Sequence, residues 1–411
     1  MDGEKKPNST LRRERQLRGW SQQKVAESIG TSEDVVSRWE RGERKPSPFF
    51  QEQLCILYGK SAEELDILAQ NEGTKRRENT EETSLVIGLA SSLAPSQDID
   101  KEIDRLVARK LARLQSWVID GLEDGTHLRW QLYYTSRNSL TEDGLLSQIT
   151  RLEQLTDDGG EYYQRMCRIL AQNYQLAGCL ARDKFQYGKS LAYFQKAEQL
   201  HKDTQLPDLT AAAIARQAVA LLRKDQQKYL DTSLTLYRNA IDTAKHAEPY
   251  TQAYVLSKYA EALARKGDYN ACIKSLDQAE TLLSRVANVP IEEDFAYVFL
   301  TLQSLTDSRG ECFVLLGKAE KGLECLQIAQ KKLDMKMSRN TCRLMMQQSE
   351  AYLAAGQPEA CVQQALKGLE IARILESTSN VHWAHEILMK LRSSAFHEES
   401  VVDELQEAIQ C

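Results

Sequence analysis

The sequence of 411 residues lacks any long apolar run. None of its stretches approaches the roughly 18 consecutive apolar residues of a membrane-spanning helix, and the apolar-leaning run 85–93 is too short to cross a bilayer. The first ten residues, MDGEKKPNST, also lack the apolar core of a signal peptide. We therefore expect a cytoplasmic protein without a membrane partner.

Paired cysteines and strand-like patterns are also missing. The nine cysteines include no C-x-x-C pair, so we expect reduced thiols rather than disulfides. Proline (8 residues) and glycine (20 residues) are sparse, and alternation of β-branched residues is rare. Most of the chain consists of strong helix formers with apolar residues three and four positions apart, which predicts an all-α fold.

No catalytic constellation stands out from the charged background. The chain shows no Ser/His/Asp set and no paired carboxylates, so we expect neither an enzyme nor a cofactor, and we assign no catalytic residue. His382 and His385 share a helix face and could both reach a metal ion, but no third ligand is apparent. We favour surface histidines and expect no metal site.

Charge is distributed unevenly along the chain. Residues 1–48 contain eleven Lys/Arg against eight Asp/Glu, whereas residues 71–411 contain 41 basic against 47 acidic residues. Only the N-terminal segment therefore suggests a polyanionic partner.

Glycines divide the N-terminal segment into short helices. Apolar faces predict helices over residues 11–18, 21–29 and 32–41, with Ser21 capping the second and Ser32 the third. A glycine follows each of them: Gly19, Gly30 and Gly42.

Two further signals complete this module. Leu54 and Leu57 form a fourth apolar stripe, and Ser61 with Glu64 forms a capping box that predicts a short fifth helix. Two short helices joined through a glycine and a small-residue turn indicate a helix-turn-helix.

The module resembles the Cro/phage-repressor (XRE) class of DNA-binding domains over residues 11 to about 68. The residues that carry the resemblance are Arg15, Gly19-Trp20-Ser21-Gln22, Val25-Ala26, Gly30, Val36-Ser37, Trp39-Glu40, Gly42 and Pro46. The resemblance implies a five-helix, λ-repressor-like helix-turn-helix domain over residues 1–68 that binds double-stranded DNA. Glu14 departs from the class, which more often has an apolar residue there.

In such a module the third helix lies in the major groove. Its expected reading surface is Ser32, Glu33, Asp34, Ser37 and Arg38. Arg38 can grip guanine bidentately, and Glu33 or Asp34 can accept from cytosine.

Other residues of the module are expected to position the backbone or the fold. Gln22 and Gln23 resemble the phosphate-clamping amides of the class. Positive charges after the third helix would neutralise phosphates: Arg41, Arg44 and Lys45. Arg15 and Glu40 match a structural pair that joins the first and third helices. Because the module carries a balance of only +3, tight binding predicts two copies on a two-fold site, hence a homodimer.

A linker and a long helical region follow. Residues 69–98 are polar at first and are expected to be a linker whose apolar part, residues 85–93, docks on the chain's own helices or on a partner. A helix is expected over residues 99–121.

From about residue 125 the chain repeats itself. Small residues recur near the end of the second helix of each repeat: Ala197, Ala240, Ala279, Ala329 and Gly368. Bulky residues mostly stand three positions earlier: Phe194, Tyr237, Leu276, Leu326 and Ala365. Seven positions before the anchors stand Ser190, Ser233, Cys272, Gly322 and Cys361. Small partners lie twelve positions before this last set, except in the second repeat, where a longer turn is expected: Gly178, Ala260, Gly310 and Ser349.

This spacing resembles the tetratricopeptide repeat (TPR). The resemblance implies an α-solenoid of TPR-like helical hairpins over residues 99–411, since small residues let antiparallel helices nest. We expect five repeats from about 161 to 376, capped by a helical pair (127–137 and 140–156) and a final helix over 379–411.

An XRE-type head on a TPR-like body resembles bacterial cytoplasmic transcription regulators, several of which bind signal peptides in the repeat groove. The expected effector groove comprises Gln172, Gln175, Arg182, Ser257, Glu261, Asp307, Glu311, Arg343 and Glu350. A peptide effector, a protein effector and a solvated groove without ligand remain open. The alternative function is a protein-interaction scaffold whose repeats recruit a partner while the head has no role on DNA.

Overall fold

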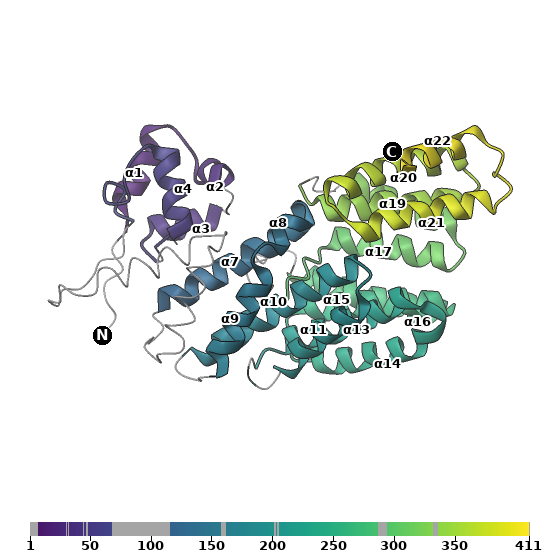
Figure 1. Cartoon of the computed structure of the whole chain (residues 1–411), viewed down its shortest axis with the longest axis horizontal. Helices are drawn as coiled ribbons and strands as arrows, with labels where there is room; N and C mark the ends of the chain where they lie inside the picture. The colour runs from purple at the N-terminus through teal and green to yellow at the C-terminus, as the bar shows by residue number, and fades with distance from the viewer. Residues whose placement is uncertain are drawn as a thin grey trace. The chain divides into compact units, whose positions relative to one another are not determined.

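The computed structural model describes residues 7–29, 31, 33–43, 45–46, 48–67, 116–157, 162–200, 203, 205–286, 294–331 and 336–410. Every regular element within these ranges is a helix, which confirms the all-α fold. The chain divides into two compact units, Met1–Gly125 and Thr126–Cys411 (Figure 1). Within the same ranges no helix combines the length and apolarity that a bilayer-spanning segment needs.

Four helices form the helix-turn-helix module: α1 (Ser9–Leu17), α2 (Gln22–Ile29), α3 (Glu33–Glu40) and α4 (Pro48–Tyr58). Their shared core is apolar and fully buried, comprising Leu11, Val25, Ala26, Ile29, Val36, Trp39, Leu54, Tyr58, Leu65 and Ile67. Gly19 and Gly42 follow α1 and α3 with φ of 65° and 70°, the left-handed conformation that glycine adopts without strain. The glycines predicted to end the first and third helices are therefore confirmed, whereas Gly30 lies outside the described residues.

The predicted fifth helix is a run of turns over residues 62–66 instead. Both capping-box bonds form: the Ser61 amide donates to Glu64 Oε2 (2.8 Å) and the Glu64 amide to Ser61 Oγ (3.2 Å). The turn ends at Asp66, whose φ of 52° is incompatible with a right-handed helix. A capping box therefore starts a turn here but does not extend it.

Five helical hairpins follow one another in the second unit, in agreement with the expected five repeats. From α13 onward, each first helix packs against its own second helix and against the second helix of the preceding hairpin. The pairs are α10 (Tyr163–Asp183) with α11 (Tyr187–Gln199), α13 (Pro207–Lys224) with α14 (Gln226–Ala244), α15 (Pro249–Lys266) with α16 (Tyr269–Val286), α17 (Leu302–Leu315) with α18 (Ala319–Lys331), and α19 (Ser338–Ala354) with α20 (Pro358–Ile374). This arrangement is an α-solenoid.

The small residues of the repeat pattern mark close approaches between paired helices. A Cβ atom on Gly178 would lie 2.5 Å from Cε1 of Phe194, and one on Gly310 would lie 2.7 Å from Cγ of Leu326. In the first hairpin Ser190 Oγ also donates to the Gly178 carbonyl (2.8 Å). Larger side chains at these glycines would force the hairpins apart.

The second hairpin differs from the others, though not by a longer turn as expected. Its connection is the single residue Asp225, which ends α13 and caps α14. The additional residues extend the helices, so that Ser233 Oγ donates to the carbonyl of Ala218, fifteen positions earlier.

The ends of the solenoid also differ in detail from the sequence prediction. It is preceded by α7 (Ser116–Thr135), α8 (Asn138–Glu142) and α9 (Leu145–Asp157). The single final helix predicted over 379–411 is wrong: α21 (Thr378–Arg392) and α22 (Ser400–Gln410) are separate helices. The predicted linker 69–98, with its apolar part 85–93, and most of the helix predicted over 99–121 lie outside the described residues.

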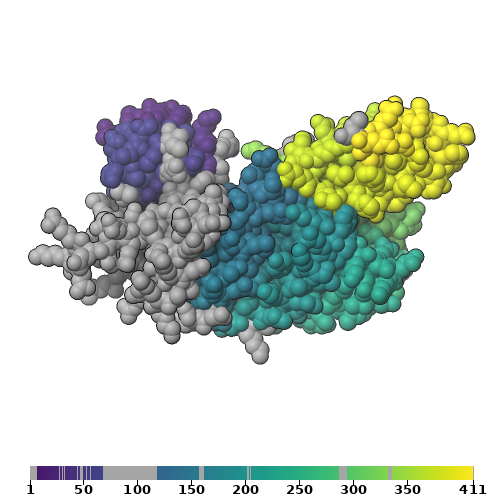
Figure 2. Space-filling view, viewed as in Figure 1, coloured from purple at the N-terminus to yellow at the C-terminus, as the bar shows by residue number. Residues whose placement is uncertain are grey.

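Buried polar contacts join the beginning of the solenoid to its end. Asn138 Nδ2 donates to Asp183 Oδ2 (2.6 Å) and its backbone amide donates to the Leu375 carbonyl (2.9 Å). Ser377 Oγ donates to Asp183 Oδ1 (2.6 Å), and Arg339 donates to Asn138 Oδ1 (2.6 Å). We call Asn138, Asp183, Arg339 and Ser377 the clasp. Because of it the hairpins form one closed turn, and the blue surface of α8 borders the yellow-green surface of the last hairpin (Figure 2).

Candidate functional site

A buried ion pair holds α3 against α1 in the helix-turn-helix module. Arg15 Nε and Nη2 donate to Glu40 Oε1 (2.6 Å) and Oε2 (2.9 Å), and Arg15 Nη1 donates to the Trp20 carbonyl (2.8 Å). Glu40 is only 4% exposed. Gln22 Nε2 also donates to Glu40 Oε2 (2.7 Å). The expected phosphate-clamping amide of Gln22 is therefore bonded to the frame of the module.

Glu14, which departs from the family pattern, forms hydrogen bonds at the edge of the core. Its carboxylate accepts from Arg18 Nη1 (2.8 Å) and Lys60 Nζ (2.9 Å). These two hydrogen bonds hold the pKa of Glu14 below its usual range. A charged residue is thereby accommodated where an apolar one is more common.

The face of α3 opposite the core carries the predicted reading residues. Val36, Trp39 and Glu40 are buried, whereas Glu33 and Arg38 are exposed. On this outer face Arg38 Nε lies 2.8 Å from Asp34 Oδ2, with both side chains nearly half exposed. Arg41 Nη1 donates to Ser37 Oγ (2.5 Å), and Arg41 Nε donates to Glu43 Oε1 (2.7 Å). Of the reading residues, Asp34 and Arg38 are thus paired with each other, and Ser37 is bonded to Arg41.

The remaining predicted DNA contacts flank α3. Gln23 is exposed on α2, and Lys45 is exposed beyond α3, where its Nζ lies 3.4 Å from the Asp66 carbonyl. Ser32 and Arg44 lie outside the described residues.

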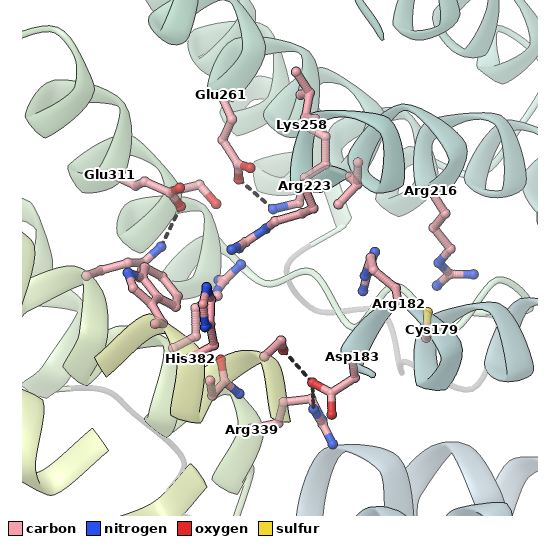
Figure 3. A pocket seen from close by; sticks show the side chains of 18 of the residues that line it. Cys179, Arg182, Asp183, Arg216, Arg223, Lys258, Glu261, Glu311, Arg339 and His382 are labelled. Atoms are coloured by element: carbon pink, nitrogen blue, oxygen red, sulfur yellow. Dashed lines mark hydrogen bonds and ion pairs between the residues drawn. The ribbon is translucent and has the colours of Figure 1, made fainter. Parts of the chain in front are cut away.

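In the second unit, a cleft of about 1040 Å³ is enclosed by the solenoid (Figure 3). Its wall consists mainly of the first helices of the hairpins together with α21. The lining positions on α15 and α19 follow the helical spacing of one face: Tyr254, Lys258, Glu261 and Arg265 on α15, and Arg339, Arg343, Gln347 and Glu350 on α19.

Five of the nine residues expected in the groove line this cleft: Arg182, Glu261, Glu311, Arg343 and Glu350. The other four are buried within the helical packing. Gln172 donates to the Phe295 carbonyl (2.9 Å), Gln175 to the Leu209 carbonyl (3.1 Å), Ser257 to the Tyr254 carbonyl (2.9 Å), and Asp307 accepts from Arg343 (2.6 Å). Ser257 and Asp307 each miss the lining face of their helix by one position.

The sequence prediction missed two walls of the cleft. Arg216 and Arg223 come from α13, the first helix of the repeat whose spacing is irregular. His382, Trp383 and Lys390 come from α21, in a region that was predicted only to cap the stack. Arg216 and Arg223 lie seven positions apart, which places them on one face of α13, and this spacing could have predicted that both line the cleft.

Positively charged and polar side chains contact the carboxylates of the cleft. Lys258 Nζ lies 2.5 Å from Glu261 Oε1, and Lys390 contacts Glu350. Gln347 Nε2 donates to Glu311 Oε2 (2.6 Å), and Arg265 lies 3.4 Å from that side chain. Burial alone would raise the pKa of Glu311, but the surrounding positive charges lower it below its usual range.

The described part of the connection between α16 and α17, residues 294–300, runs along the inner face of the solenoid. Arg216 donates to the carbonyls of Ala296 (2.9 Å) and Tyr297 (3.1 Å), and Tyr297 stacks on Trp130 at a ring-centroid distance of 5.2 Å. We call residues 294–300 the inner segment. Its last three residues, Val298, Phe299 and Leu300, line the cleft.

The two histidines considered as metal ligands lie on α21 at the cleft. His382 Nε2 is 3.7 Å from Glu386 Oε1, and the His382 ring packs edge-on against Phe185. Throughout the described ranges, no cluster of three His, Cys, Asp or Glu side chains is placed to hold a metal ion.

Comparisons with known proteins identify the N-terminal module. Residues 9–68 match the family model of the helix-turn-helix domain. A search of curated proteins found no match. Among solved structures, BtubC (BKLC) from P. vanneervenii is 11% identical, with 57% of this chain and 90% of that chain covered and a TM-score of 0.40. Bacillus thuringiensis PlcR, solved in complex with the peptide PapR7 and DNA, is 15% identical, with 83% and 99% covered and a TM-score of 0.35. Likenesses this weak carry no argument about function. Residues 9–68 are a helix-turn-helix domain.

Proposed function

We propose that this protein is a sequence-specific, DNA-binding transcription regulator that acts as a homodimer, with an effector-binding cleft in its repeat unit. The observation that supports it most is the outer face of α3, where Asp34, Ser37, Arg38 and Arg41 cluster on a helix-turn-helix domain. A family of this kind favours a regulator over an enzyme.

The ion pairs on α3 are weak enough to be exchanged for DNA. Arg38 and Asp34 are 44% and 45% exposed, and an exposed pair contributes only about 0–1 kcal/mol to stability. A bidentate contact from arginine to guanine contributes about 1–3 kcal/mol of base discrimination. Arg38 therefore gains by leaving Asp34 for a guanine, while Asp34 and Glu33 disfavour wrong bases and nearby phosphates.

Backbone contacts complete the proposed interface. Gln22 and Gln23 stand at the start of α2, whose N-terminal amides favour a phosphate. Arg41, Arg44 and Lys45 follow the reading positions and neutralise phosphates, while Ser32 belongs to the proposed reading surface. Two copies on a two-fold site double these contacts.

The repeat unit is the proposed sensor. A cleft of about 1040 Å³ with convergent charged and aromatic side chains has the size and lining of a ligand site. We propose a peptide or small protein segment as its effector, which alters DNA binding through the repeat unit.

The experiment that tests this function is sequencing of the genomic DNA fragments retained by the purified full-length protein, followed by binding measurements on the enriched sequence. We expect a recurring, two-fold symmetric site whose affinity falls steeply with salt. Absence of salt-dependent binding to any duplex, including the protein's own promoter region, contradicts the proposal.

A scaffold function is the second candidate, and the pairing of Asp34 with Arg38 favours it, because it reduces the positive charge offered to DNA. In that case residues 99–411 would recruit the same partner as the full chain, and Arg38→Ala would leave the cellular phenotype unchanged.

A further inference from the structure

The charges that line the cleft are unbalanced, although the chain as a whole is acidic. Nine Lys/Arg residues and six Asp/Glu residues line it, an excess of three positive charges. A cleft of this sign concentrates anions from solution.

All six carboxylates of the cleft are already engaged. Glu261, Glu311 and Glu350 contact Lys258, Arg265 and Lys390, respectively. The other three carboxylates contact Arg339 (Asp183), the Lys228 backbone amide (Asp225) and His382 (Glu386). Four of the six carboxylates are thus in ion-pair contact with a lysine or an arginine.

Three guanidinium groups that line the cleft have no carboxylate in ion-pair contact among the described residues: Arg182, Arg216 and Arg223. Arg182 is the last arginine of α10, and the other two lie seven positions apart on α13. Figure 3 shows interactions at Glu261, Glu311 and Asp183 but none between these three arginines and the other residues drawn. We call these three residues the basic cluster.

The partners of the basic cluster are all neutral. Arg216 is 3% exposed and donates to Gln175 and to two carbonyls of the inner segment, with its guanidinium 4.9 Å from the Trp130 ring centroid. Arg223 lies 5.3 Å from the ring centroid of Trp383, across the cleft on α21. Neutral partners satisfy hydrogen bonds without cancelling charge, so burial of this cluster is unfavourable until an anion arrives.

Arg182 and Arg223 both line the cleft, on α10 and α13 respectively. The positive charges of both act on the Tyr187 hydroxyl, although burial keeps its pKa above the usual value. Arg216 already donates to Gln175 and the inner segment. Arg182 is hydrogen-bonded to the Tyr133 side chain, and a guanidinium group has five N–H donors, so Arg182 and Arg223 keep donors for a ligand.

We propose that the cleft binds an anionic ligand whose carboxylate or phosphate group is held by Arg182 and Arg223, between α10, α13 and α21. Tyr133, Tyr134, Tyr254 and Trp383 line the same region and pack against the ligand's apolar part. The cleft volume of about 1040 Å³ leaves room for several residues or for a phosphorylated metabolite beyond the anionic group. This inference rests on the proposed effector role of the cleft and names the chemistry of the effector.

The test is calorimetric binding of two anionic probes, pyrophosphate and triglutamate, to the full-length protein at low ionic strength, with N-acetylated and C-amidated triglutamine as the neutral probe. We expect Arg182→Gln and Arg223→Gln each to weaken binding of the preferred anion about 10-fold or more, since a charge-assisted hydrogen bond is lost. Arg182→Lys and Arg223→Lys retain part of the affinity because they retain the charge. The matched control is Arg238→Gln, the same change at an exposed position of α14 outside the cleft, which leaves binding unchanged.

The outcomes separate the ligand sources and the two proposals. Preference for pyrophosphate identifies a phosphate ligand, and preference for triglutamate identifies a carboxylate ligand. Without probe, the glutamine variants unfold at the same temperature as the wild type or higher, because a like-charge repulsion is removed. Equal anion binding by Arg182→Gln, Arg223→Gln and Arg238→Gln, or no binding by the wild type, overturns the anion site. If the protein binds the anion through Arg182 but does not bind DNA, the anion site is supported and only the proposed function is contradicted.

Discussion

The outer face of α3 and the clasp of the repeat unit use the same side-chain types under different burial. Arg38 and Asp34 on α3 are 44% and 45% exposed, whereas Arg339 and Asp183 in the clasp are 10% and 5% exposed. Water screens the first pair, so it contributes about 0–1 kcal/mol and can be exchanged for a ligand. Removing one partner of a buried pair costs about 3–5 kcal/mol. Burial therefore separates the ion pairs that hold the fold from those available for recognition.

The largest expected effect is the loss of the buried pair in the helix-turn-helix domain. Glu40→Ala leaves Arg15 without its carboxylate and is expected to destabilise the domain by about 3–5 kcal/mol. Chemical denaturation of the full-length protein measures the loss. The control is Glu33→Ala, an exposed acid on the same helix, for which we expect a change within about 0.5 kcal/mol. Similar losses of stability in Glu40→Ala and Glu33→Ala would contradict the expected difference between buried and exposed charges.

The clasp provides the next test. Asp183→Asn keeps the shape of the side chain but removes the charge opposite Arg339, and a hydrogen bond to a charged group contributes about 1.5–3 kcal/mol. We therefore expect a loss of that size in the stability of the repeat unit, with hydrogen exchange rising first around residues 138 and 377. Unchanged exchange at both places would show that the two ends of the solenoid are not coupled through Asp183.

Arg38→Ala tests whether the exposed arginine of α3 serves recognition and not stability. Loss of a bidentate guanine contact is expected to reduce discrimination between the selected site and random duplex by about 1–3 kcal/mol, with little change in stability. Lys45→Ala serves as the matched comparison: it should weaken both duplexes equally and lower the salt slope by about 1. Quantitative binding at several salt concentrations distinguishes the two patterns, and a uniform loss in Arg38→Ala would make it a phosphate contact.

The smallest effect is expected at Asp34. Asp34→Asn breaks an exposed pair with Arg38, so the free energy of unfolding should change by less than about 1 kcal/mol. Binding to non-cognate DNA should rise, because a negative charge facing the phosphates is removed. Unchanged or weaker non-specific binding would show that Asp34 does not oppose the DNA backbone.

Much of this architecture follows from local sequence signals. Gly19 and Gly42 predicted the ends of helices because only glycine adopts positive φ without strain, and the small residues at 178 and 310 predicted helix pairs because nothing larger fits there. The turn at Asp66 was missed because a capping box specifies how a helix starts and not how far it continues.

The cleft was harder to predict because it depends on long-range closure. A one-residue shift along a helix turns a side chain by about 100°, which placed Ser257 and Asp307 inside the packing and not at the cleft. Trp383 reaches Arg223 only because the last helices return to the first ones, and no local sequence pattern predicts that contact.

The meeting of the two ends also fixes how many hairpins this solenoid can have. Open helical arrays gain or lose units with little penalty, since each unit touches only its neighbours. Here Asn138 must reach Leu375 across the whole set, so removing or inserting one hairpin would displace the partners by the thickness of a unit. The number of hairpins can vary in an open array, whereas in this chain the contact between the two ends fixes it.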